Sequence, residues 1–217
     1  MEQLPPATLF EASLADDLSG TSPVARAAAV QVFNYFKNAA LFRWSDANND
    51  CEDRANAICI LLETWNIPNC KAWVFSGYFR RKGFGNLSKR WNYHVAAALP
   101  VQHESEVVFY VIDPATSAGP TTIEAWALNV TESGTSYHFI KKGDYYIFPA
   151  RKIKGDNWHK RDKRNYNWTM QGLGGINGAS SIGKAQLAFH KKAVKKTATL
   201  FQQLLKKSPF VFPPGPL

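Results

Sequence analysis

Cysteine is scarce in this sequence. The chain has three in 217 residues, Cys51, Cys59 and Cys70, which are too few and too irregularly spaced for a disulfide framework. They form no C-x-x-C pair, so their spacing does not fit a zinc site, and we expect no metal or other cofactor. At most Cys59 and Cys70 could pair with each other, and two buried thiols are the stronger expectation.

Long apolar runs and an export signal are also absent. No stretch approaches the roughly 18 uninterrupted apolar residues that a membrane-spanning helix needs. Residues 1–6 (MEQLPP) do not combine a basic segment with an apolar core, so no signal peptide is visible. We therefore expect the protein to remain inside the cell, to leave it by another route, or to have lost a leader.

Acidic residues are missing from the last quarter of the chain. All 17 Asp and Glu lie in residues 1–162 together with 17 of the 26 Lys and Arg, so the net charge of +9 belongs to residues 163–217. A hydrophobic content of 45% and an aromatic content of 13% exclude a disordered chain. The length is enough for one large domain, or for a domain with an appendage.

Residues 50–65 (DCEDRANAICILLETW) are predicted to form a helix that begins at a cysteine. Its apolar residues recur at helical spacing, and they are Ala55, Ile58, Cys59, Leu62 and Trp65. Residues 48–50 can cap the helix, and Pro68 follows its end. Unpaired N–H groups and the helix dipole favour a thiolate at Cys51, but the charges of Glu52 and Asp53 oppose it, so activation requires a partner. The alternative is that Cys51 is an ordinary small buried residue.

The rest of the chain favours a mixed fold. Residues 7–18 and 22–42 are predicted helices, and the second has Ser22 as its N-cap and Pro23 at its first helical position. Its core-facing side is expected to consist of Ala27, Val30, Phe33 and Phe36. Segments rich in aromatic and β-branched residues are predicted strands, and they are residues 72–79, 91–99, 107–113 and 137–148. The predicted fold class is α+β, with the helix that begins at Cys51 packed on an antiparallel sheet.

We expect three regions: N-terminal helices packed on the core over residues 1–44, a core over 45–150, and a basic extension over 151–217. Residues 80–90 are predicted to form a basic loop, and residues 151–167 interleave basic and aromatic side chains, as surfaces that bind single-stranded nucleic acid do. A C-terminal helix is predicted at about residues 184–207, followed by an extended arm. One side of this helix carries Leu187, Val194, Phe201 and Leu204. The other sides carry Lys191, Lys192, Lys195 and Lys196.

The second and third predicted strands bring a histidine and an aspartate together. If they form a hairpin centred between His103 and Glu104, His94 lies opposite Asp113, and small residues lie opposite large ones. Side chains directly opposite each other have Cβ atoms about 4.5–5.5 Å apart, so the aspartate can reach one ring nitrogen of the histidine and fix its tautomer. A slip of one residue would separate the pair.

Cys51 placed against the other nitrogen of His94 completes a triad of nucleophile, base and orienting carboxylate. Each residue also has a simpler explanation. A lone histidine at a strand start is usually hydrogen-bonded or solvated, and Asp113 before Pro114 is usually a turn former. The order Cys, His, Asp, on a helix start and on neighbouring strand ends, weakens both explanations.

Several linked motifs resemble the bacterial protein-glutaminases. They are Asp50-Cys51, Arg54-Ala55, Trp91-Asn92-Tyr93-His94-Val95-Ala96, Ile112-Asp113-Pro114, Ala118-Gly119-Pro120 and Ala125-Trp126, and the resemblance covers roughly residues 45–130. These enzymes are protein-glutamine deamidases with a transglutaminase-like, papain-related core. The resemblance implies that Cys51 is the nucleophile, His94 the general base and acid, and Asp113 the orienting residue. It does not extend to the basic C-terminal region.

The mechanism implied by this resemblance is acyl transfer. Cys51 attacks the carboxamide of a glutamine in a protein or peptide, ammonia leaves with a proton from His94, and water hydrolyses the thioester to glutamate. The oxyanion needs hydrogen-bond donors, of which the Cys51 backbone N–H is the first candidate. Weaker candidates for the oxyanion or for substrate binding are Trp44, Asn48, Trp91 and Tyr93, and the last two are more simply explained as packing beside the site.

Other functions stay open at this point. Transglutaminases and cysteine peptidases use the same triad, and only the Gly119-Pro120 and Trp126 motifs favour a deamidase. A different class is a non-catalytic basic binding module in which Cys51 is structural. We expect a monomer whose partners are a glutamine-bearing protein or peptide and, for the basic tail, an acidic protein rather than a membrane surface or nucleic acid.

Overall fold

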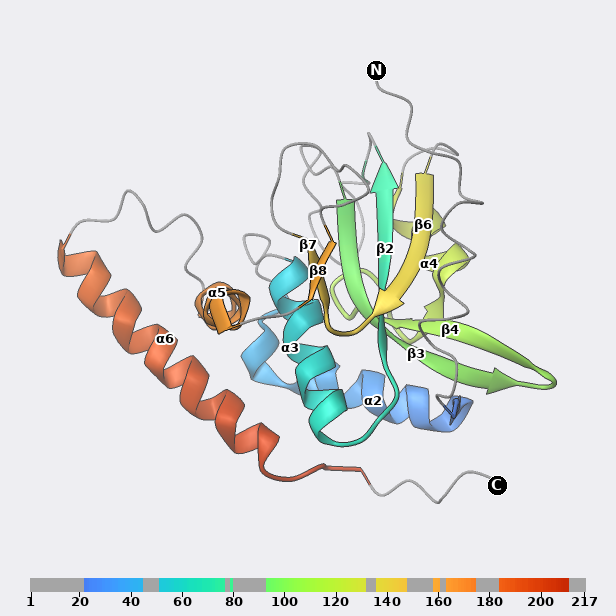
Figure 1. Cartoon of the computed structure of the whole chain (residues 1–217), viewed down its shortest axis with the longest axis horizontal. Helices are drawn as coiled ribbons and strands as arrows, with labels where there is room; N and C mark the ends of the chain where they lie inside the picture. Colours follow the sequence, from blue (N-terminus) through green and yellow to red (C-terminus); the bar gives the residue numbers. More distant parts are fainter. Residues whose placement is uncertain are drawn as a thin grey trace.

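The computed structural model describes residues 22–44, 51–76, 79, 93–131, 136–147, 158–160, 163–174 and 184–210. Figure 1 shows a twisted sheet with helices packed around it, which confirms the predicted α+β class. The predicted helix over residues 7–18 and the basic loop over 80–90 lie outside the described residues.

The larger sheet is built from six strands, β1 (Val24–Ala25), β2 (Cys70–Ser76), β3 (Tyr93–His103), β4 (Glu106–Ile112), β5 (Thr121–Thr122) and β6 (Ser136–Lys142). Their order is β5-β4-β3-β2-β6, and these neighbours are antiparallel. The short β1 pairs in parallel with β3. A separate two-stranded sheet pairs β7 (Tyr145–Ile147) with β8 (Trp158–Lys160), so the predicted strand over 137–148 is two strands joined by a turn.

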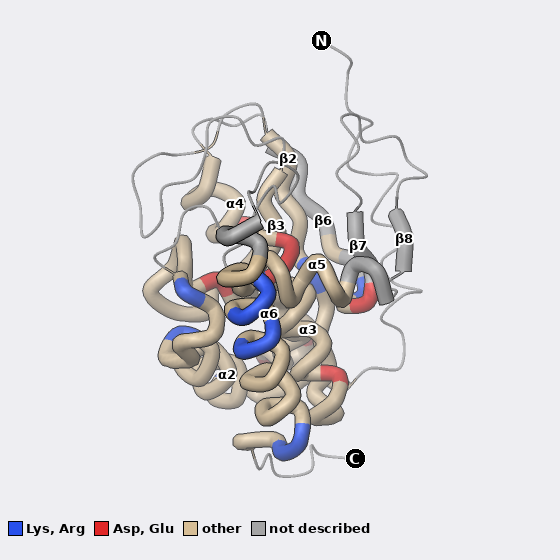
Figure 2. Tube along the Cα trace, turned by 90° about the vertical axis from the view of Figure 1, so that its left-hand side faces the viewer, with Lys and Arg blue, Asp and Glu red and all other residues tan. Residues whose placement is uncertain are grey.

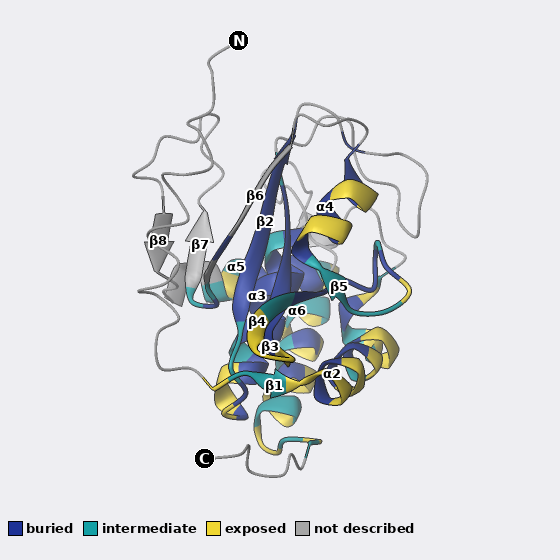
Figure 3. Ribbon diagram, turned by 90° about the vertical axis from the view of Figure 1, so that its right-hand side faces the viewer, coloured by how far each residue is buried: buried dark blue, intermediate teal, exposed yellow. Residues whose placement is uncertain are grey.

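Helices cover both faces of the larger sheet. They are α2 (Arg26–Asn38), α3 (Cys51–Thr64), α4 (Ile123–Val130), α5 (Lys163–Leu173) and α6 (Lys184–Leu205), with a short 3-10 helix at Ala40–Phe42. Side chains alternate along β3, so Leu99 and Val101 join a core with α2, α3, α5 and α6, whereas Ala96 and Ala98 join a core with α4. Figure 3 shows the strands buried between these helices.

The predicted register of the β3–β4 hairpin is wrong by two residues. His103 pairs with Glu106, so the turn is centred between Glu104 and Ser105. Glu104 has a φ of 54°, and positive φ values are typical of the turns that close two-residue hairpins. Because side chains alternate with a period of two, this shift leaves every residue on its predicted face. It places Asp113 just beyond the end of the ladder, level with Ala96 rather than with His94.

The predicted helix over residues 22–42 begins later than expected. Val24 and Ala25 form β1 against Val101 and Gln102, because the sheet offers them backbone hydrogen bonds that a first helical turn would leave unmade. The helix α2 therefore starts at Arg26, and Ser22 does not cap it.

The buried side of α2 is also turned relative to the prediction. Phe33 and Phe36 are buried as expected, but Ala27 and Val30 are exposed. The later start and the contact with β3 bring a neighbouring row of side chains to the core, and this row consists of Ala28, Ala29, Val32, Phe33 and Phe36.

The helix α3 runs through the middle of the molecule. Its predicted apolar side is confirmed, because Ala55, Ile58, Cys59, Leu62 and Trp65 are all buried. Polar residues of the same helix are buried as well, since the sheet covers one side of α3 and α5 covers another. Such positions require hydrogen-bond partners inside the protein.

The helix α5 supplies some of these partners. The Asn56 side-chain amide donates to the Thr169 hydroxyl at 2.8 Å, and the buried Lys71 ammonium donates to the Asn56 carbonyl oxygen at 3.1 Å. The backbone of α5 also comes very close to α3, because a Cβ atom on Gly172 would lie 1.8 Å from Asp53 Oδ2. The basic C-terminal region therefore packs directly on the helix that begins with Cys51.

The helix α6 lies outside α5 and closes the same core. Phe201 is buried, and the Trp65 indole donates to the Leu204 carbonyl at 3.1 Å. Exposed lysines lie along this helix, as Figure 2 shows, and they are Lys191, Lys192, Lys195 and Lys196. Among the helices of the described residues, none is long and apolar enough to cross a membrane.

Candidate active site

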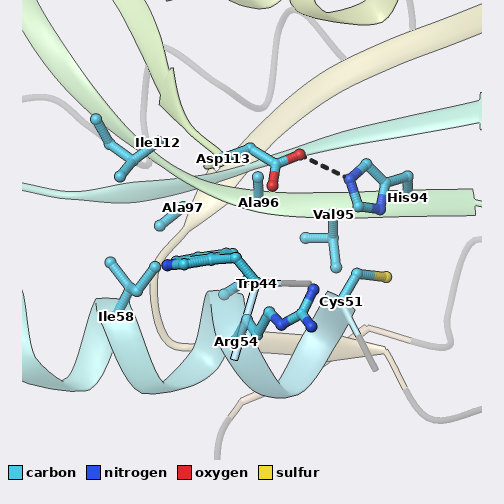
Figure 4. Close-up of a pocket in the computed structure, with 11 residues that line it drawn as sticks. Trp44, Cys51, Arg54, Ile58, His94, Val95, Ala96, Ala97, Ile112 and Asp113 are labelled. Carbon is cyan, nitrogen blue, oxygen red and sulfur yellow. Dashed lines mark hydrogen bonds and ion pairs between the residues drawn. The ribbon is translucent and has the colours of Figure 1, made fainter. Parts of the chain in front are cut away.

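A pocket forms where the β3–β4 ladder ends. The strand β4 stops at Ile112, which pairs with Ala97, and the chain turns at Asp113. His94 lies beyond the last pair of the ladder, and Cys51 is the first residue of α3. These three predicted residues line the pocket together with Trp44, Arg54, Ala55, Ile58, Val95, Ala96, Ala97 and Ile112 (Figure 4).

The end of the ladder explains why these residues can meet. His94 follows the alternation of Ala96 and Ala98, so it belongs to the face of β3 that α4 covers. Cys51 comes from α3, on the opposite face. Among the described residues no strand pairs with β3 on the β4 side beyond Ala97, so side chains from both faces reach the same space at this edge.

Asp113 is held by hydrogen bonds from several directions. Its Oδ2 atom accepts from His94 Nε2 at 2.8 Å, from the Trp126 indole at 3.0 Å and from the Thr116 hydroxyl. Its Oδ1 atom accepts from the Ala115 backbone N–H at 3.3 Å. Burial alone would raise the pKa of Asp113, but the charge of His94 and the hydrogen bonds from His94, Thr116 and Trp126 outweigh burial and lower that pKa. Asp113 is therefore a stable, oriented carboxylate.

The imidazole of His94 is fixed between two neighbours. Its Nε2 faces Asp113, and its ring centroid lies 5.3 Å from that of Trp126 at an interplanar angle of 32°. Because an ionised carboxylate only accepts hydrogen bonds, Nε2 carries a proton in this pair. Figure 4 shows the other ring nitrogen on the side of the ring nearer to the Cys51 sulfur. The predicted His–Asp contact is present, although the register that was expected to create it is not.

Cys51 differs from the other two cysteines in its surroundings. It is 7% exposed at the start of α3, and its thiol donates to Glu52 Oε2 at 3.3 Å. The thiols of Cys59 and Cys70 are fully buried and donate to backbone carbonyls at 3.5 Å. Burial, with the charge of Cys59, raises the pKa of the Cys70 thiol. All three cysteines are free, as predicted, and only Cys51 lines this pocket.

Arg54 and Trp44 form one wall of the pocket. The buried Arg54 guanidinium donates to the carbonyls of Phe42 and Arg43 at 3.1 and 2.9 Å, and it lies 5.3 Å from the centroid of the Trp44 ring. The Trp44 indole donates to the Phe36 carbonyl at 2.8 Å. That hydrogen bond uses the donor that an oxyanion role would need, so Trp44 shapes the pocket without supplying a free N–H.

Tyr93 packs against the cluster of buried residues that contains Cys51. Its hydroxyl donates to Glu52 Oε1 at 3.2 Å, and its ring packs against those of Trp73 and Phe75 with centroid distances of 5.4 and 5.8 Å. The other two predicted candidates for oxyanion or substrate binding, Asn48 and Trp91, lie outside the described residues.

Sequence reasoning missed several residues that support the site. Thr116 follows Asp113 by three positions, a spacing typical of an aspartate-centred turn, so its hydrogen bond had a local signal. The contacts of the Trp126 indole with Asp113 and of the Glu52 carboxylate with Tyr93 had no such signal, because they depend on how α4 and α3 pack on the sheet. Within the described residues, no group of three His, Cys, Asp or Glu side chains could hold a metal ion.

A glutaminase family model matches residues 29–130. No curated protein matches the chain. A crystal structure of protein-glutaminase is similar, with a TM-score of 0.55 and 18% identity over 76% of this chain and 97% of that chain.

Two further solved structures are similar. One is the NMR structure of protein-glutaminase from Chryseobacterium proteolyticum, with a TM-score of 0.51 and 19% identity over 73% of this chain and 92% of that one. The other is a crystal structure of pro-protein-glutaminase, with a TM-score of 0.54 and 20% identity over 83% of this chain and 71% of that one. At these identities the likeness establishes a shared fold. Together with the family model, it confirms the predicted resemblance to the protein-glutaminase family.

Proposed function

From the confirmed resemblance to the protein-glutaminase family, we propose that this protein deamidates glutamine side chains of proteins or peptides to glutamate and releases ammonia. The observation that carries the proposal is the oriented His94–Asp113 pair, with Nε2 and Oδ2 2.8 Å apart, in the pocket that Cys51 also lines. A cysteine, an imidazole and a carboxylate in one pocket are the groups that nucleophilic acyl transfer requires.

In this proposal the core is transglutaminase-like and papain-related, and the three residues act as a catalytic triad. Cys51 is the nucleophile at the start of α3, where backbone N–H groups without intrahelical acceptors favour negative charge. His94 takes the thiol proton through Nδ1, because Asp113 already engages Nε2. Asp113 keeps the ring in this tautomer and stabilises the imidazolium that forms.

The reaction has two halves that both use His94. The Cys51 sulfur forms a bond to the carboxamide carbon, and the carbon–nitrogen bond breaks as ammonia leaves with the proton held by His94. A water molecule then gives a proton to the same imidazole and attacks the thioester. The carbon–sulfur bond breaks, the thiol regains its proton, and glutamate is released.

The oxyanion of each tetrahedral intermediate needs hydrogen-bond donors. The backbone N–H of Cys51 is the candidate that the helix start supports, since first-turn N–H groups have no intrahelical acceptor. Asn48 and Trp91 remain candidates for a second donor.

Ammonia release from a glutamine-containing peptide tests the function. Wild-type protein is expected to release ammonia and to add about one dalton to the peptide for each glutamine converted, whereas Cys51→Ala is expected to do neither. Cys59→Ala is the matched control, because it removes a buried thiol outside the pocket. Cross-linking to an added amine would indicate a transglutaminase, chain cleavage a peptidase, and activity retained in Cys51→Ala would overturn the proposal.

Thiol reactivity tests the triad separately from turnover. An alkylating reagent at neutral pH is expected to modify Cys51 before Cys59 and Cys70, and His94→Ala is expected to lose this preference. Equal labelling of the three cysteines in the native protein would instead favour the non-catalytic binding module.

The exposed side of α6 supports a proposal about partners. Lys191, Lys192, Lys195 and Lys196 are exposed on consecutive turns, and residues 163–217 contain no acidic residue to offset them. Like charges at this spacing weaken a helix unless something compensates them. An acidic protein surface, docked on the outward side of α6 in Figure 2, is the partner that this charge fits.

A further inference from the structure

The carboxylate of Glu52 connects Cys51 of α3 to Tyr93 of β3. Its Oε2 accepts from the Cys51 thiol at 3.3 Å, and its Oε1 accepts from the Tyr93 hydroxyl at 3.2 Å. The neighbouring Asp53 cannot play this part, because it is buried against Gly172 of α5. Of the two acidic residues in the first turn of α3, only Glu52 touches a reacting atom.

Tyr93 holds this carboxylate in place. Its ring packs between side chains of the sheet, with centroids 5.4 Å from Trp73 and 5.8 Å from Phe75. It also precedes His94 on β3, so the base and the anchor of Glu52 come from consecutive residues on opposite faces of one strand. Glu52 is therefore positioned by the same rigid element that carries His94.

A carboxylate beside the nucleophile opposes the chemistry unless something offsets it. When the Cys51 thiol loses its proton, the thiolate and Glu52 become like charges in a partly buried place, which is unfavourable. The other ionisable groups of the described residues around Cys51 are His94 and Tyr93 from β3 and Arg54 from α3, and Asp113 stands behind His94. A substrate that donates hydrogen bonds to Glu52 would compensate the carboxylate.

We infer that Glu52, held by Tyr93, distinguishes the carboxamide of the substrate from the carboxylate of the product. This inference rests on the proposed function. A primary carboxamide has two N–H donors, and one of them can reach Glu52 while its carbonyl oxygen points to the backbone N–H at the start of α3. The product carboxylate has no donor at neutral pH, and its charge is repelled by Glu52.

This role explains how a deamidase can release its product. The substrate and the product have almost the same shape, so shape alone cannot separate them. A fixed negative charge makes the site bind the carboxamide much more tightly than the carboxylate. An acceptor placed for an N–H group stays unpaired when the bound group has no N–H to donate. Once the carbon–nitrogen bond has broken and water has added, Glu52 changes from a binding partner to a repelling one.

Product inhibition measures this discrimination. The inhibition constant of a glutamate-containing peptide is compared with the KM of the matching glutamine peptide for the wild type, Glu52→Gln and Tyr93→Phe. Glu124→Gln is the matched control, because Glu124 is an exposed acidic residue in the first turn of α4.

In Glu52→Gln, the inhibition constant of the glutamate peptide divided by the KM of the glutamine peptide is expected to fall by about tenfold, since one nearby charge has been removed. A smaller change of the same sign is expected in Tyr93→Phe, and none in Glu124→Gln. The rate at which Cys51 is alkylated rises with pH, and the midpoint of this rise is expected to move to lower pH in Glu52→Gln, because the thiolate no longer faces a carboxylate.

An unchanged ratio in Glu52→Gln, in an enzyme that still deamidates, would overturn the inference. If Glu52→Gln lost all turnover, the binding constants of the glutamate and glutamine peptides would be measured by calorimetry, and Tyr93→Phe would supply the kinetic ratio. Ammonia release that is absent from the wild type would overturn the proposed function instead.

Discussion

The pocket and the C-terminal helix α6 use charged residues in opposite ways. Around the pocket, Arg54, His94 and Asp113 are buried, and hydrogen bonds hold each of them to another side chain or to the backbone. Along α6, lysines lie exposed with no acidic residue after position 162. Buried charge therefore fixes positions inside this molecule, whereas exposed charge is left for something outside it.

The helix α5 belongs with the first of these regions, although its sequence is part of the basic C-terminal segment. It meets α3 through the Asn56–Thr169 hydrogen bond and through the close approach of Gly172 to Asp53. The basic C-terminal segment therefore first packs on the core through α5 and then presents exposed lysines on α6.

Replacing the buried carboxylate of Asp113 is expected to have the largest effect on activity. Asp113→Asn is expected to lower kcat about 10³–10⁴-fold, because a neutral amide neither holds the productive tautomer of His94 nor stabilises its charged form. Ammonia release by the purified variant measures the effect, with circular dichroism to show that it is folded. A loss of less than about tenfold would mean that the His94–Asp113 pair is structural.

Gly172→Ala tests whether α5 is part of the core. The added methyl group would collide with Asp53, a short and buried side chain with little room to move, so the free energy of unfolding is expected to fall by about 1–3 kcal/mol. Denaturant unfolding measures this change. Gly119→Ala is the control, because nothing lies within 4 Å of the place that its added methyl group would take. Equal stability of the two variants would show that α5 can separate from α3 at little cost.

Acid is expected to weaken the fold through Asp113. Because the folded state lowers the pKa of Asp113, its contribution to stability is complete above the unfolded value of about 3.9 and is lost as the pH falls through the folded pKa. The effect should be smaller than that of Gly172→Ala, since burial of the carboxylate offsets much of what its partners contribute. Urea unfolding from pH 5 downward measures it, and Asp113→Asn should show a weaker loss over the same range. Identical acid dependence in both proteins would contradict this account.

Replacing the exposed lysines of α6 is expected to have the smallest effect on the stability of the fold. Replacing Lys191, Lys192, Lys195 and Lys196 by Gln should change the free energy of unfolding by no more than about 0.5 kcal/mol and leave deamidation of a short neutral peptide unchanged. Binding to an acidic protein should weaken and lose its dependence on salt, because screening acts on exposed charges. Binding of the wild type to anionic vesicles or to nucleic acid, but not to acidic proteins, would reject the proposed partner.

Much of the fold could be predicted because it depends on local patterns. Apolar spacing identified α3 and its buried side, and β-rich segments identified β2, β3 and β4 to within a few residues. The predicted start of α2 was wrong, because Val24 and Ala25 pair with a strand that lies far along the chain. A local sequence pattern does not show that a distant sheet edge competes with the first helical turn for the same residues.

The candidate site shows the same division. Cys51, His94 and Asp113 could be singled out by residue type and by their places on a helix start and strand ends. The hairpin register could not, since a shift of two residues keeps the same alternation of faces. The contact between His94 and Asp113 survived this error because the shift left both side chains on the face that was predicted for them.

The sequence by itself determined which chemical groups stand at which local positions: a thiol at the first residue of a helix, a histidine near the start of a strand and an aspartate just after the next one. Only the tertiary structure decided which atoms meet. It joined Trp126 to Asp113, Glu52 to Tyr93, and α5 to α3. Most of these contacts link elements that are distant in the chain, and they form only because the packed sheet and helices bury the surfaces between them.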